Sequence, residues 1–112
     1  MIEPVTQRPQ ARVDLLEQFV YFGEETSVSM AERYFSAVDE TCLLLVKQPR
    51  MGTLHESNVP ELTEMRKMPV RGFENHLIFD SPRPGGIDVI RVVHGARHLD
   101  DLFGAEDVSG EE

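Results

Sequence analysis

The chain of 112 residues carries a formal net charge of −9 at pH 7, which argues against tight binding to a bare nucleic-acid backbone because such binding requires a basic surface. Its 40% hydrophobic content suffices for one domain with a small core, and the single cysteine, Cys42, excludes an internal disulfide. We find no hydrophobic run near the ~18 residues of a membrane span and no basic-then-apolar leader, so we expect a cytoplasmic protein without a membrane segment.

The first part of the chain predicts a short strand and then an amphipathic helix. The strand falls within Pro4 to Arg8, and Pro9 suits the first position of the helix. An apolar stripe with three- and four-residue steps predicts that the helix ends at Gly23. The stripe consists of Leu15, Phe19 and Phe22, with Leu16 and Val20 beside it.

A second helix is predicted by the strongest periodicity in the sequence. Its apolar positions are Val28, Ala31, Phe35, Val38, Cys42 and Leu45. Ser27 or Ser29 can cap its start, and Pro49 forbids its continuation. Two amphipathic helices joined this closely form a hairpin whose apolar stripes cannot all cover each other, so a sheet must pack against them.

The second half of the chain predicts that sheet as an antiparallel meander. A polar loop from Thr53 to Pro60 comes first. The expected strands are Met65 to Val70, His76 to Phe79 and Ile87 to Val93, with turns at Arg71-Gly72-Phe73 and from Ser81 to Gly86. We therefore expect an α+β domain over residues 1–103, with a two-helix hairpin on a small antiparallel sheet in the order β-α-α-β-β-β. Residues 104–112 contain four acids and no base, and we expect this acidic tail to be disordered.

The candidate functional residues are the cationic side chains and histidines of the sheet. They are Arg66, Arg71, Arg91, His94, Arg97 and His98. Arg66 and Arg71 also fit an ordinary solvated sheet face, and Arg91 and His94 also fit structural roles. No pair of His or carboxylate residues has the ligand spacing of a metal site with a plausible third member, so we expect none and no cofactor.

Strand alternation limits how these residues can cooperate. On a regular strand Arg91 would share one face with Val89 and Val93, whereas His94 would lie on the other face with Val92. Arg91 and His94 would then form one site only if a bulge rotated the chain.

Five segments in order along the chain resemble the RelE/ParE superfamily of bacterial type II toxins. They are Ala11-Arg12-Val13-Asp14-Leu15, Ala31-Glu32-Arg33-Tyr34-Phe35, Pro49-Arg50-Met51-Gly52, Glu64-Met65-Arg66-Lys67-Met68 and Ile90-Arg91-Val92-Val93-His94-Gly95-Ala96-Arg97. The similarity covers Pro4 to Phe103 and is strongest to the ParE, or plasmid-stabilisation, branch. Membership of a superfamily does not by itself fix the activity.

The resemblance implies a toxin of one of two kinds. RelE-like members cleave messenger RNA on the ribosome, whereas ParE-like members inhibit DNA gyrase through a protein contact, without catalysis. The acidic balance favours a protein target. Two departures from the family pattern also favour a protein target over RNA. Asp80 stands where relatives carry a basic residue, and His98 follows Arg97 where relatives carry an aspartate. A non-toxic interaction module on the same scaffold remains an alternative.

The resemblance also implies a partner, a co-encoded ParD-like antitoxin that forms a hetero-oligomer with the toxin. Its C-terminal segment would be disordered when free and would wrap around the toxin beside the helical hairpin. Tyr21 and Tyr34 lie off the main apolar stripes. Because tyrosine combines a large contact area with a polar tip, we expect these two residues to contact the antitoxin.

Overall fold

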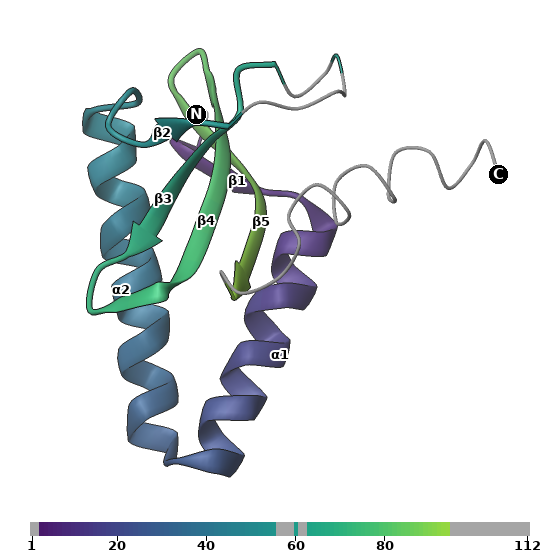
Figure 1. Ribbon diagram of the computed structural model, residues 1–112, viewed down its shortest axis with the longest axis vertical. Helices are drawn as coiled ribbons and strands as arrows, with labels where there is room; N and C mark the ends of the chain where they lie inside the picture. The colour runs from purple at the N-terminus through teal and green to yellow at the C-terminus, as the bar shows by residue number, and fades with distance from the viewer. Residues whose placement is uncertain (1–2, 56–59, 61–62, 95–112) are drawn as a thin grey trace, which may run out of the picture.

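A helical hairpin packs against one face of a five-stranded sheet (Figure 1). The structure, a computed structural model, describes residues 3–55, 60 and 63–94. Its elements are β1 (Val5–Gln7), α1 (Pro9–Glu25), α2 (Val28–Lys47), β2 (Thr53–Leu54), β3 (Arg66–Val70), β4 (Phe73–Arg83) and β5 (Gly86–His94). The predicted two-helix hairpin on a small sheet is confirmed. The acidic tail lies outside the described residues.

Local signals in the sequence set the ends of both helices. Pro9 occupies the first turn of α1, and the backbone N–H of Thr26 closes the helix by donating to the carbonyl of Phe22 at 2.9 Å. The Ser27 hydroxyl caps α2 by accepting from the backbone N–H of Met30 at 3.0 Å. Helix α1 passes the expected end at Gly23 by two residues, because a glycine inside a helix is only mildly unfavourable and is tolerated here.

The sheet differs from the predicted meander because its first strand is parallel to its last. The strand order is β1-β5-β4-β3-β2, with β1 parallel to β5 and every other pair antiparallel. The Ile87 backbone N–H donates to the Pro4 carbonyl at 2.8 Å. A Cβ at position 86 would lie only 1.8 Å from that carbonyl oxygen, so Gly86 permits the pairing. Strand β2 adds a short edge within the segment expected to be a loop.

Strand β4 is longer than the sequence predicts, and the turn after it is tighter. The turn predicted from Ser81 to Gly86 contained too many residues, because β4 continues to Arg83 and Arg83 pairs with Gly86. Gly85 adopts a φ of +84°, a conformation that favours glycine, and so allows the chain to reverse. The two ends of the long β4–β5 ribbon therefore lie far apart, and the candidate residue His94 lies at the end away from the turn.

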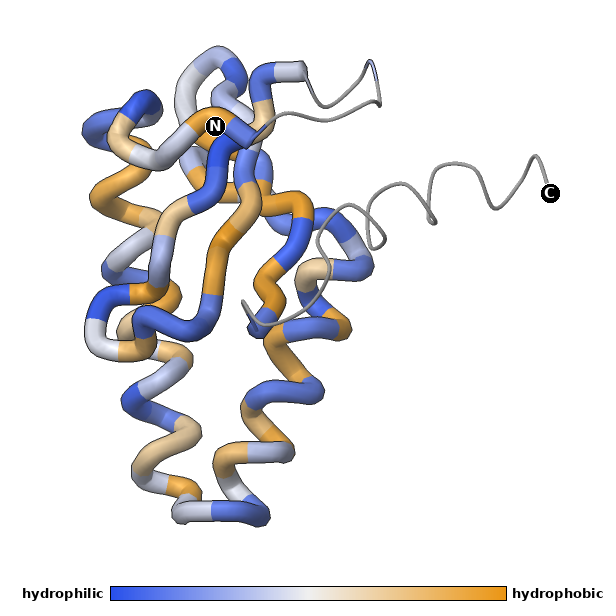
Figure 2. Tube along the Cα trace, viewed as in Figure 1, coloured by the Kyte–Doolittle hydropathy of each residue, from blue (hydrophilic) through white to orange (hydrophobic). Residues whose placement is uncertain are grey.

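Buried hydrophobic residues lie on both faces of the sheet. The main core lies between the helices and the sheet, and Figure 2 shows hydrophobic positions recurring along both helices. A second cluster contains Met65, Phe79, Ile90 and Val93 and no helical residue.

A bulge in β5, opposite Phe79 and Asp80 of β4, changes the faces expected for β5. Phe79 pairs with Arg91, but Asp80 pairs with Val89, so Ile90 is the additional residue on β5. Val89 and Val92 consequently belong to the helix-facing core, whereas Ile90 and Val93 belong to the second cluster. The prediction that Val89 and Val93 share one face was therefore wrong.

Candidate partner-binding groove

Arg91 lies inside the fold and is paired with Asp14 of α1. Its Nε and Nη2 atoms donate to the two carboxylate oxygens at 2.8 and 3.0 Å, and the backbone N–H of Val92 donates to the same carboxylate at 3.1 Å. The exposed fractions of the two side chains are only 5% for Arg91 and 6% for Asp14. The ion pair therefore joins α1 to β5, which is the structural role that the sequence left open for Arg91.

His94 lies at the exposed end of β5, directly opposite His76 on β4. The ring centroids of the two histidines are 5.1 Å apart. His76 is buried, and its Nδ1 atom lies 3.5 Å from the Tyr34 hydroxyl. Burial, together with the nearby His94, lowers the pKa of His76 below its usual value of 6.5.

Arg66 and Arg71 lie at opposite ends of β3. Arg66 donates to the Gly52 carbonyl at 2.8 Å, next to β2. Arg71 is exposed at the turn between β3 and β4. The structure therefore brings Arg71 and His94 to the same end of the sheet, and it places Arg66 at the other end. Arg97 and His98 lie outside the described residues.

The two tyrosines expected at a partner interface have different surroundings. Tyr21 is exposed on α1, but Tyr34 is completely buried, with its ring against those of Phe22, Phe73 and His76. The prediction that Tyr34 lies off the buried stripe was wrong. The buried face of α2 includes Ala31, Tyr34, Val38, Thr41 and Leu45, and Phe35 is consequently turned outward and 40% exposed.

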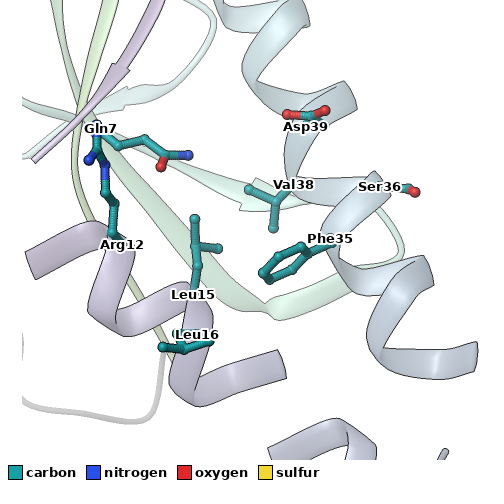
Figure 3. A pocket seen from close by; sticks show the side chains of 8 residues that line it. All are labelled: Gln7, Arg12, Leu15, Leu16, Phe35, Ser36, Val38 and Asp39. Atoms are coloured by element: carbon teal, nitrogen blue, oxygen red, sulfur yellow. The ribbon is translucent and has the colours of Figure 1, made fainter. Parts of the chain in front are cut away.

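Phe35 instead lines an open groove between the two helices. We call this groove, of about 520 Å³, the hairpin groove; it is lined by Gln7, Arg12, Leu15, Leu16, Phe35, Ser36, Val38 and Asp39. Leu15 on α1 faces Phe35 and Val38 on α2 across it (Figure 3). Arg12 and Asp39 add one charge of each sign. The sequence analysis expected a docking surface beside the helical hairpin, but it assigned the contacts to Tyr21 and Tyr34, neither of which lines this groove. Leu16, an exposed apolar residue beside the buried stripe, was a signal for the groove.

Exposed apolar side chains are concentrated on the helical hairpin. Seven of the nine large exposed hydrophobic residues in the described part of the chain belong to α1 or α2: Val13, Leu16, Val20, Tyr21, Val28, Phe35 and Leu43. Neither described helix is long and apolar enough to cross a membrane. Among the described residues, no three His, Cys, Asp or Glu side chains are placed to hold a metal ion. An apolar surface of this kind is typical of a protein contact.

The structure is a small α+β domain with an exposed apolar groove on its helical hairpin, and comparison with known proteins gives its family. Residues 5–99 match the family described as the ParE toxin of the type II toxin-antitoxin system parDE, and the chain belongs to this family. A search of curated proteins finds no match.

A solved structure described as the chromosomal ParDE TA system from P. aeruginosa has the same fold. A chain of that structure is 14% identical to this one, with a TM-score of 0.64 over 80% of this chain and 92% of that chain. At this identity the similarity supports the fold alone.

Proposed function

We propose that this ParE-family toxin inhibits DNA gyrase by direct contact and is neutralised by a ParD-like antitoxin that occupies the hairpin groove. The apolar surface on α1 and α2 carries the proposal, because a free domain gains nothing by keeping Leu16 and Phe35 in water. Fully burying one such side chain contributes about 1.5–3 kcal/mol. A segment that is disordered when free could use this energy to offset the entropy it loses on binding.

The charges beside the groove favour an amphipathic segment as its occupant. Arg12 and Asp39 both line the groove and are both exposed. An antitoxin segment with apolar residues toward Leu16 and Phe35 and charged residues at its borders would match this pattern. Tyr21, exposed further along α1, is a proposed additional contact.

The separation of the candidate residues favours inhibition by contact over RNA cleavage. Acid–base cleavage requires several groups within hydrogen-bond reach of the reacting atoms. Here Arg91 is held by Asp14, and Arg66 lies at the opposite end of the sheet from Arg71 and His94. The net charge of −9 also disfavours docking among RNA phosphates. The argument from Asp80 does not hold, because Asp80 is fully buried and cannot repel an RNA ligand at the surface.

Gyrase and the ribosome can be distinguished with purified components. We expect the toxin to make cleaved DNA accumulate in a reaction containing gyrase, ATP and supercoiled plasmid, and to leave ribosome-bound messenger RNA intact. In cells without antitoxin, the DNA-damage response should precede the arrest of translation. Cleavage of ribosome-bound RNA would support the ribonuclease alternative. If neither activity appears and growth is unaffected, the chain is a non-toxic interaction module.

The residues proposed to contact gyrase are His94, Arg71, Arg97 and His98. Arg97→Ala should abolish gyrase inhibition and change the free energy of unfolding by no more than about 1 kcal/mol, as for an ordinary surface substitution. A large loss of stability would show that Arg97 has a structural role instead.

The hairpin groove predicts which apolar residues matter for neutralisation. Leu16→Glu should weaken antitoxin binding at least ~10-fold, because it places a charge where an apolar side chain must be buried. Leu43→Glu is the matched control, since Leu43 is also exposed on a helix but does not line the groove. Calorimetry with the cognate antitoxin should show little change for this control. Equal losses in both variants would argue against the groove as the docking site.

A further inference from the structure

Two histidines meet at the end of the sheet where β4 begins and β5 finishes. His76 and His94 are cross-strand partners, and their rings are nearly perpendicular, with an interplanar angle of 83°. His76 also contacts Phe22 of α1 and Tyr34 of α2, with ring centroids 5.6 and 5.0 Å away. His76, together with Phe73 of the same strand, thus joins this end of the sheet to both helices of the hairpin.

The surroundings of His76 are unsuited to a positive charge. From α2, Tyr34 offers a hydroxyl that burial and the charge of Asp14 keep protonated by raising its pKa. From α1, the Asp14 carboxylate is engaged by Arg91 and Val92. From β5, the His94 ring lies 5.1 Å from the His76 ring and contributes to lowering the pKa of His76. On β4 itself, Glu74 accepts a hydrogen bond from the backbone N–H of Gly72 at 2.9 Å.

We propose that His76 and His94 form a proton-sensitive latch, which holds this end of the sheet against the helical hairpin at neutral pH and releases it on acidification. Two like charges would lie about 5 Å apart, and the charge on His76 would lie among aromatic rings, so protonation of His76 favours an open arrangement in which His76, like the exposed His94, reaches water. Opening would expose Phe22 and Phe73, which line a cavity of about 410 Å³ next to both histidines. This inference does not depend on gyrase being the target.

The direction of the pH dependence follows from the lowered pKa of His76. Well above pH 6.5 both the closed and the open states hold a neutral His76, so the proton does not favour opening. Between pH 6.5 and the lower pKa of the closed state, only the open state binds the proton. The ratio of open to closed molecules should rise by up to ~10-fold per pH unit across this window for each proton taken up.

NMR titration and hydrogen exchange of the full chain test the latch. His76 should titrate below pH 6.5, and amides near Asn75 and Val93 should lose protection between pH 7.5 and 5.5, after correction for intrinsic rates. The amides of Ile87 to Val89, which pair with β1, should keep their protection against exchange over the same pH range. A normal His76 titration, or unchanged protection at both ends, would overturn the proposal.

Two variants and a control locate the effect. His94→Asn removes the second charge and should move the pKa of His76 upward, whereas His55→Asn, whose ring packs on Phe79, should not. His76→Phe keeps a ring against Phe22 and Tyr34, and should abolish the acid-induced loss of protection. Even if His76→Phe fails to fold, an absent shift in His94→Asn would contradict the latch.

Discussion

Asp14→Ala should lower the free energy of unfolding by about 3–5 kcal/mol, the typical loss when one partner of a buried ion pair is removed. The guanidinium of Arg91 would remain buried, and its Nε and Nη2 atoms would lose the carboxylate oxygens to which they donate. The backbone N–H of Val92 would also lose its acceptor. Since small domains are stable by only about 5–15 kcal/mol, this loss removes between about a fifth and all of the total stability. Urea unfolding followed by circular dichroism measures the change.

A double variant separates the pair itself from the penalty of breaking it. Asp14→Leu combined with Arg91→Met leaves no buried charge, and it should be more stable than Asp14→Ala alone. A loss below about 1 kcal/mol in Asp14→Ala would mean that Arg91 finds water or another acceptor. Arg91 would then again be available as a residue that contacts the target.

Elements with strong local signals could be predicted from the sequence. The repeating apolar steps from Val28 to Leu45, ended by Pro49, predicted α2 almost to its boundaries. Pro9 correctly indicated the start of α1. The glycine at position 72 correctly indicated the turn after β3, where it adopts a φ of +83°. These features depend on residues within one or two turns of each other.

Features that depend on distant residues could not be predicted in the same way. The pairing of β1 with β5 joins Val5 to Ile87, and nothing in either segment specifies a parallel partner. The bulge at Ile90 cannot be seen by an argument from strict alternation, although it decides which β5 residues face the helices. An assumed strict alternation of side chains along β5 therefore placed Val89 and Val93 on the same face, although they face opposite sides of the sheet.

Tyr34 is buried and Phe35 is exposed, the reverse of what the sequence predicted, and this error has a different cause. The predicted stripe included Phe35 and left Tyr34 out, although Ala31, Tyr34, Val38, Thr41 and Leu45 also follow three- and four-residue steps. Adjacent residues on a helix differ in direction by about 100°, as 3.6 residues per turn requires, so the rotation of α2 about its axis decides between them. The buried position was decided by the rings of Phe22, Phe73 and His76, which come from other elements. The hairpin groove follows from this choice, because it leaves Phe35 facing solvent beside Leu16.

Asp80 should make the protein less stable as the pH rises through the range of about 3.8 to 6. This side chain is fully buried, and neither of its carboxylate oxygens has a hydrogen-bond partner. Burial raises its pKa from 3.8 to about 6, despite the opposing effect of Arg66. Because the native state then binds a proton that the unfolded state has lost, Asp80 costs about 3 kcal/mol of stability by pH 7, and none below pH 3.8.

Asp80→Asn should remove this pH dependence while nearly preserving volume. We expect the variant to be about 1–3 kcal/mol more stable than the wild type at pH 7.5 and equal to it within about 0.5 kcal/mol at pH 4, as measured by urea unfolding at each pH. Asp88→Asn is the control, because Asp88 lies on the adjacent strand and its carboxylate makes an exposed ion pair with Arg8 at 3.0 Å. Losing that pair should cost no more than about 1 kcal/mol and should not stabilise the protein at any pH. If Asp80→Asn is destabilising at pH 7.5, the Asp80 carboxylate must be ionised and paired with Arg66 in solution.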